Sequence, residues 1–123
     1  MSNFTPLVEK IHTFEGDEIR VTFSRLRRKH ILKLMPLIQS LDHANSKKDK
    51  SKVDVIQSDL LGQILEILPE HIKEFTGLKD KDGNAISFDT VADDTYFLNL
   101  STDIGMQLIE ESLPMMGSKG KNG

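Results

Sequence analysis

The stretch "LKDKDGNAISFDTV", residues 78–91, brings together several oxygen ligands that a calcium ion could use. An EF-hand calcium loop needs ligands at its first, third, fifth and twelfth positions and a glycine at its sixth. If Gly83 is that glycine, the first ligand is Leu78, whose side chain has no oxygen. If the loop starts at Asp80, alanine stands at the glycine position and valine at the twelfth. Neither alignment gives a calcium site.

The same stretch has the composition of a tight turn. Asp82, Gly83 and Asn84 are residue types that accept positive φ at low cost, and the apolar residues Leu78 and Ile86 flank them. The sequence therefore predicts a turn that joins two short extended pieces, without a bound metal.

Residue types that act in catalysis or metal binding occur here without the necessary spacing. The chain has no cysteine, no HExxH-like histidine pair, no glycine-rich phosphate loop and no nucleophile elbow. The paired acids Glu110-Glu111 and Asp93-Asp94 lie at expected helix ends. We therefore predict no catalytic, cofactor-binding or metal-binding residue, and we expect the histidines on the surface. They are His12, His30, His43 and His71.

The basic run "RLRRKH", residues 25–30, indicates an alternative function. Basic side chains on one helix face can neutralise the phosphates of a nucleic acid, here with help from the lysines of residues 47–52. A solvated helix face is the simpler interpretation, because acidic residues precede the run closely and no aromatic platform accompanies it. The alternative is a small nucleic-acid-binding regulator that uses Arg25, Arg27, Arg28, Lys29 and Lys33.

The composition is that of one globular domain. The chain has 123 residues, of which 37% are hydrophobic and 28% charged, and a net charge of −3. We predict a single domain over residues 1–116 and a flexible tail over residues 117–123. The net charge gives no overall attraction to nucleic acid or to an anionic membrane, and no run approaches the roughly 20 apolar residues of a membrane span. We therefore expect a soluble protein.

Alternating apolar residues on both sides of the sequence "EGDE" predict a β-hairpin over residues 7–23. From Arg25 the apolar spacing becomes helical, with Ser24 as the expected N-cap. Pro36 either kinks this helix or separates two helices. The polar, lysine-rich residues 43–52 are expected to form a solvated loop.

Three further helical segments follow. Residues 53–68 have apolar side chains over half of a helix circumference, and Pro69 is expected to begin a short helix that ends near Phe75. A last helix is expected from Asp93 or Asp94 to Pro114. The predicted fold is α+β, an N-terminal β-hairpin packed against three to four helices.

The last helix has two apolar stripes. The first contains Phe97, Leu100, Ile104 and Leu108, and the second is displaced by roughly 150° at 100° per residue. Either both stripes are buried within the domain, or the second is covered by another chain. Three methionines nearby suit a surface that accepts irregular apolar partners. The candidate partner-binding residues are Leu98, Met106, Ile109, Leu113, Met115 and Met116.

Taken in order, these features resemble the tail assembly chaperones of siphovirus-type bacteriophages. The resemblance covers most of the chain. It lies in "IRVTFSRLRRKHILKL", where a strand leads into a helix, in the charged loop and apolar helix that follow, and in "HIKEFTGLKDKDGNAISFDTVADD". The last segment has the pattern GL.D.DG..I.F followed by an acidic helix start. Phe88 stands where the family commonly has an aromatic residue.

The resemblance implies a function without a cofactor. Such a chaperone binds the tape measure protein, a long helical chain with an apolar stripe, keeps it soluble, and helps to recruit tail tube subunits. It acts in the host bacterial cytoplasm and is absent from the mature virion; self-association is left open. Family members often have a second, frameshifted form, and codons for residues 119–121 could contain the slippery heptamer GGGAAAG.

Overall fold

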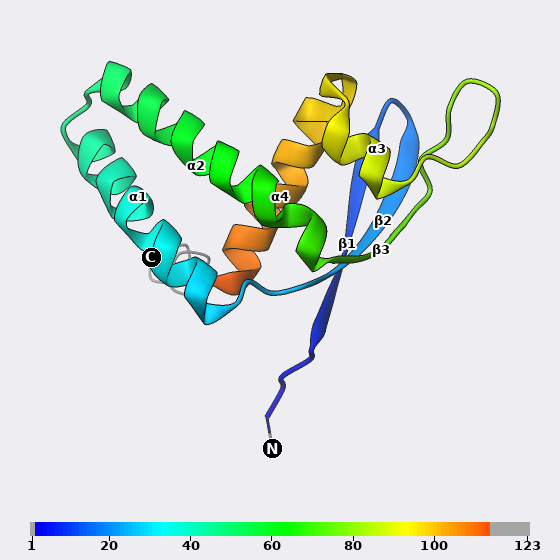
Figure 1. Cartoon of the computed structure of the whole chain (residues 1–123), viewed down its shortest axis with the longest axis horizontal. Helices are drawn as coiled ribbons and strands as arrows, with labels where there is room; N and C mark the ends of the chain where they lie inside the picture. The colour runs from blue at the N-terminus through cyan, green and yellow to red at the C-terminus, as the bar shows by residue number, and fades with distance from the viewer. Residues whose placement is uncertain (1, 114–123) are drawn as a thin grey trace.

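The computed structural model describes residues 2–113, which form a three-stranded sheet and four α-helices (Figure 1). The elements are β1 (Leu7–Phe14), β2 (Asp17–Ser24), α1 (Arg28–Ser46), α2 (Lys50–His71), β3 (Ile72–Thr76), α3 (Phe88–Asp93), the 3₁₀ turn η1 (Thr95–Phe97) and α4 (Leu98–Ser112). This arrangement confirms the predicted α+β class, with an N-terminal hairpin packed against helices.

The sheet is antiparallel, and β2 lies in its centre. A two-residue turn joins β1 to β2, with φ of 51° at Glu15 and 89° at Gly16, as a tight hairpin turn requires. Three side chains of β2 are completely buried and form the floor of the core: Ile19, Val21 and Phe23. The sheet therefore has one face packed on the core and one face toward solvent.

The helices cover the core-facing side of the sheet. Helices α1 and α2 lie side by side as a long helical hairpin, and α4 packs against both α2 and β1. At one end of β1, Phe14 stacks on Phe97 with ring centroids 5.5 Å apart. In the middle of β1, Lys10 Nζ lies 2.9 Å from Glu111 Oε2 at the end of α4. Helix α4 is thus held between the sheet and the helical hairpin.

The prediction of a solvated loop over residues 43–52 is wrong. Helix α1 continues to Ser46 and α2 begins at Lys50, so three residues connect them. Lysine is a good helix former, and the Asp49 side chain caps α2 by accepting a hydrogen bond from the Lys52 backbone N–H at 3.2 Å. The polar composition reflects exposure rather than irregular structure.

The prediction of a short helix from Pro69 to Phe75 is also wrong. Helix α2 continues through Pro69 to His71, and β3 follows immediately. The free edge of β2 carries backbone groups that need partners, and β3 supplies them by pairing Phe75 with Val21. Pro36 likewise lies inside the single helix α1, at an exposed position where water can satisfy the carbonyl that the proline leaves without a partner.

Of two predicted helix starts, one is wrong and one is confirmed. Ser24 is not the N-cap of α1, because it is still paired in β2 and the helix begins at Arg28. The expected acidic start near residue 94 is confirmed, since the Asp94 side chain accepts a hydrogen bond from the Tyr96 backbone N–H at 2.9 Å. This bond caps η1, which leads directly into α4.

Candidate functional site

An open apolar groove of about 240 Å³ lies where α1, α2 and α4 meet. Helix α4 contributes Met106, whose side chain is 45% exposed, at the rim of this groove. Most of the groove is hydrocarbon, so it offers apolar contact with few hydrogen-bonding groups. The lining residues are Leu41, Gln57, Leu60, Leu61, Ile64, Thr102, Met106 and Ile109.

The six predicted partner-binding residues fall into four groups. Met106 and Ile109 line the groove, whereas Leu98 is exposed at the start of α4, two turns from Met106. Leu113 is partly buried against the core. Met115 and Met116 lie outside the described residues, as do residues 117–123.

Ile109 does not belong to a free surface as the second stripe assumed. It is only 2% exposed, because α4 fits into the angle between the sheet and α2 and therefore buries a wide arc of its circumference. The side chains on this arc include residues of both stripes. The apolar surface that α4 leaves accessible consists of Leu98, Met106 and the groove beside Met106.

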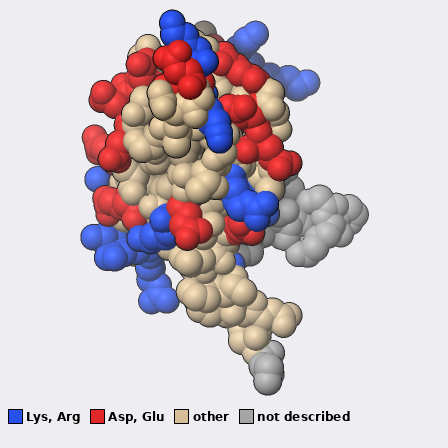
Figure 2. All heavy atoms as spheres, turned by 90° about the vertical axis from the view of Figure 1, so that its right-hand side faces the viewer, with Lys and Arg blue, Asp and Glu red and all other residues tan. Residues whose placement is uncertain are grey.

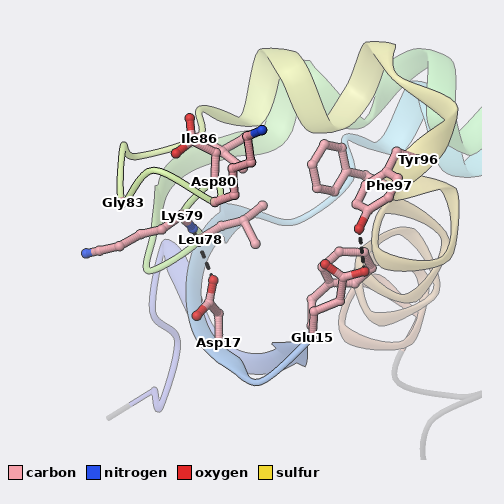
Figure 3. A pocket seen from close by; sticks show the side chains of 11 residues that line it. Glu15, Asp17, Leu78, Lys79, Asp80, Gly83, Ile86, Tyr96 and Phe97 are labelled. Atoms are coloured by element: carbon pink, nitrogen blue, oxygen red, sulfur yellow. Dashed lines mark hydrogen bonds between the residues drawn. The ribbon is translucent and has the colours of Figure 1, made fainter.

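A second cleft, of about 590 Å³, is formed by the β1–β2 turn, residues 78–86 and the residues before α4 (Figure 3). Two of its carboxylates, those of Glu15 and Asp17, accept hydrogen bonds from neighbouring residues of the cleft. The Tyr96 hydroxyl donates to Glu15 Oε2 at 2.5 Å, and the Lys79 backbone N–H donates to Asp17 Oδ2 at 3.1 Å. The Glu15 carboxylate raises the pKa of Tyr96, because deprotonation would lose this hydrogen bond. These contacts hold the loop against the hairpin.

The predicted turn within residues 78–91 is confirmed. Lys79 and Ala85 form an antiparallel bridge, and Gly83 has φ of 85°. The Asp80 carboxylate accepts hydrogen bonds from the backbone N–H groups of Asn84 and Asp82, each at 2.9 Å, and these bonds lower the pKa of Asp80. Across residues 2–113 no three His, Cys, Asp or Glu side chains are arranged to hold a metal ion. Asp80 therefore serves the turn.

The expectation that all four histidines lie on the surface is wrong for His71. Its side chain is 3% exposed, its Nδ1 lies 3.2 Å from Ser24 Oγ, and its Nε2 lies 3.4 Å from His30 Nδ1. Burial, and second the nearby His30 ring, lower the pKa of His71. The adjoining cavity, lined by His30, is about 20 Å³, enough for one water but not for a substrate.

A sequence signal for the burial of His71 existed. The buried positions of α2 are Leu60, Ile64, Leu68 and His71, which have the spacing of one helix face. Pro69 hides this signal, because a proline normally marks a helix boundary and here lies inside α2. The His30 contact had no such signal, since it joins α1 to the end of α2.

The basic residues of the alternative function do not form one patch. Arg25 is occupied: its Nη1 donates to the Thr5 carbonyl at 2.6 Å and its guanidinium lies 5.7 Å from the centre of the Phe4 ring. The exposed basic side chains near residue 28 and those of residues 47–52 stand at opposite ends of α1. A helix rises about 1.5 Å per residue, so the two groups are roughly 28 Å apart.

Comparisons of the chain with models of known protein families, with curated proteins and with solved structures found no match. Among the described residues, no helix combines the length and the apolar character that a membrane crossing requires. The function of the groove between α1, α2 and α4 therefore has to follow from its own shape and lining.

Proposed function

We propose that the chain is a bacteriophage tail assembly chaperone that binds the tape measure protein, keeps it soluble and helps to recruit tail tube subunits. The observation that carries this proposal is the open apolar groove with Met106 at its rim. The resemblance drawn from the sequence supports it independently. The site of action would be the host bacterial cytoplasm, and the protein would be absent from the mature virion.

The groove suits a helix better than a small molecule. Its volume of about 240 Å³ lies below the roughly 300–1,000 Å³ that small-molecule pockets usually have. An amphipathic helix binds by inserting a few apolar side chains of one face into such a groove. The unbranched side chain of Met106 can adjust to different partner side chains, which a repeated stripe along a very long helix requires.

The proposed mechanism needs only weak contacts. A long helical chain with an exposed apolar stripe aggregates unless that stripe is covered. Many chaperone copies, each bound through a shallow groove, would cover the stripe, while each single contact stays weak enough for release when tube subunits assemble. No covalent step or nucleotide is involved.

The test is co-expression with a tape measure protein, a long helical chain. We expect the wild-type protein to co-purify with this chain and to keep it soluble. Met106→Glu should weaken binding at least tenfold, which is about 1.4 kcal/mol, because a carboxylate would have to be buried against apolar side chains. Val55→Glu is the matched control, since Val55 is exposed on α2 outside the groove and its replacement should leave binding unchanged.

Two outcomes would contradict the proposal. One is a tape measure chain that stays soluble alone and never co-purifies with the protein. The other is equal binding by the Met106→Glu variant, the Val55→Glu variant and the wild type, which would exclude the groove as the contact surface.

A further inference from the structure

Strand β1 has an edge that no described residue pairs with, because the strand order is β1-β2-β3. In a two-residue hairpin the residues that flank the turn, here Phe14 and Asp17, exchange backbone hydrogen bonds, and bonded pairs then alternate along the strands. The even-numbered residues of β1 therefore bond to β2. The backbone N–H and C=O groups of the odd-numbered residues point toward the free edge; these are Leu7, Glu9, Ile11 and Thr13.

The position of Gly77 supports this assignment. A Cβ atom at Gly77 would collide with the carbonyl oxygen of Glu18, so this oxygen points toward the β3 side of β2. The even-numbered residues of β2 thus face β3, and its odd-numbered residues face β1. Since odd residues of β2 pair with even residues of β1, the odd residues of β1 are the free ones.

The β1 edge lacks most of the features that usually protect an edge strand. Such edges are blocked by proline, bulges, very short strands or charged side chains. Strand β1 pairs one to one over eight residues without a bulge, and both of its charged side chains have partners within the molecule: Lys10 is bound to Glu111 of α4, and Glu9 lies 3.3 Å from Arg20 of β2. The opposite edge, β3, has five residues and an irregular register with β2. The two edges of the sheet are therefore not equivalent.

Apolar side chains accompany the free backbone groups. Leu7 and Ile11 are 45% and 50% exposed and lie on the solvent face of the sheet, on the side opposite α4. The uncharged residues 2–6 precede β1 as an irregular segment with a bend at Pro6, and they extend away from the body of the molecule at the bottom of Figures 1 and 2. A strand added beside β1 would place its own solvent-face side chains against Leu7 and Ile11.

We propose that β1 pairs with β1 of a second copy of this chain, antiparallel and with Ile11 opposite Ile11, giving one continuous six-stranded sheet. The choice of a second copy and of this register comes from the charges along β1. Opposite like charges destabilise a strand pair. In such a symmetric pair one residue, the centre, lies opposite the same residue of the other copy. If the centre is Glu9, two glutamates face each other, and if it is Lys10, two lysines do. If the centre is His12, Glu9 of each copy faces Glu15 of the other.

The register centred on Ile11 avoids all of these conflicts. It sets Ile11 against Ile11, Glu9 against Thr13 and Val8 against Phe14. Centres nearer either end would leave most of β1 unpaired, because the strand runs only from Leu7 to Phe14.

Single cysteines test the pairing, because the natural chain has none. Bonded residues opposite each other in an antiparallel pair have Cα atoms about 5.5 Å apart, within the range of a disulfide. With the purified chain in oxidised glutathione, we expect Ile11→Cys to form covalent dimers rapidly. Thr22→Cys is the control, since Thr22 lies on the same solvent face but in the central strand, and it should remain monomeric.

The register has its own test. Glu9→Cys alone should not form dimers, whereas Glu9→Cys mixed with Thr13→Cys should form mixed dimers.

The proposal is overturned if Ile11→Cys reacts no faster than Thr22→Cys and sedimentation finds a monomer, or if Glu9→Cys links to itself. It is also overturned if the β1 amides become protected from hydrogen exchange only when the tape measure chain is added. None of the first three measurements needs that partner, so pairing and the chaperone function can fail separately.

Discussion

Gly105 of α4 lies close against Ile64 of α2. A Cβ atom at this position would lie 2.7 Å from Cγ2 of Ile64, and Ile64 is itself fully buried. The contact is too short for two carbon atoms, so the absence of a side chain at residue 105 sets the spacing of the two helices. The wall of the apolar groove depends on this spacing, since Ile64 lines it.

We expect Gly105→Ala to lower the free energy of unfolding by about 1–2 kcal/mol, since the strain of overpacking exceeds the gain in helix propensity. Urea denaturation would measure this change, provided that the slope of the unfolding free energy against urea concentration is the same in both proteins. The matched control is Gly62→Ala on α2, where a Cβ atom meets nothing within 4 Å. It should raise the free energy of unfolding by about 0.5–1 kcal/mol. If both variants have the same effect, close packing at Gly105 is excluded.

His71 makes the folded state sensitive to acid. Burial and the adjacent His30 ring lower its pKa below the ordinary value of 6.5, and burial also lowers the pKa of His12. Just below pH 6.5 the unfolded chain therefore binds more protons at these histidines than the folded chain does. The stabilising contribution is complete above pH 6.5 and is lost as the pH falls through and below that value.

The free energy of unfolding should therefore decrease below pH 6.5, by at most about 1.4 kcal/mol per pH unit for each proton concerned. Urea titrations at a series of pH values would measure this slope. His71→Gln should reduce the slope because it removes one of the buried rings. Substitution of the exposed His43 by glutamine should leave the slope as it is in the wild type. Equal slopes in all three proteins would contradict the assignment.

Helices α1 and α4 are joined by one hydrogen bond at their ends. The Leu26 backbone N–H, just before α1, donates to Ser112 Oγ at the end of α4, at 2.8 Å. Leu26 is buried in the core and the hydrogen bond is partly buried, so removal of the serine hydroxyl would leave this N–H with little access to water. A residue near the end of the chain thus holds the segment between β2 and the helical hairpin.

Ser112→Ala should lower the free energy of unfolding by about 1–2 kcal/mol, because it leaves a partly buried donor without a partner. The control is Ser46→Ala, whose hydroxyl donates to the exposed His43 carbonyl within the same helix. We expect that variant to remain within about 0.5 kcal/mol of the wild type. Thermal or urea unfolding compares them. Faster hydrogen exchange at the Leu26 amide in Ser112→Ala would locate the effect, and unchanged exchange would argue against it.

The charges of the whole molecule are strongly segregated along the chain. Residues 20–52 contain ten Lys and Arg but only two Asp, whereas residues 53–113 contain three Lys against thirteen Asp and Glu. The fold packs α1 against α2, so the basic segment lies beside the beginning of the acidic one. Figure 2 shows acidic and basic side chains interspersed around uncharged surface on one face of the molecule. This mixture weakens any long-range attraction to a polyanion.

We therefore expect no retention on heparin at an ionic strength of about 0.15 M, where charges beyond roughly 8 Å are screened. A salt gradient on a heparin column measures this. The double variant Arg28→Gln with Lys29→Gln is the control, and it should elute where the wild type does. Strong wild-type retention that this variant loses would favour the nucleic-acid-binding alternative over the chaperone proposal.

The parts of the fold that follow local periodicity were predictable from the sequence. Alternation over residues 7–23 identified the hairpin, and the apolar spacing of residues 53–68 identified the body of α2. Both patterns depend on neighbours within a few positions, where side-chain direction follows directly from the backbone repeat. For the same reason the turn at Gly83 and the helix start at Asp94 were predicted correctly.

Tertiary structure alone decided the features that depend on distant residues. Strand β3 exists because the edge of β2 needs a partner, although its own sequence suggested a helix. The burial of His71 and of Ile109 follows from the packing of helices that are far apart in the chain. The groove beside Met106 arises from three helices at once. Sequence periodicity shows that a helix has apolar faces, but the neighbouring elements determine which part of each face is covered.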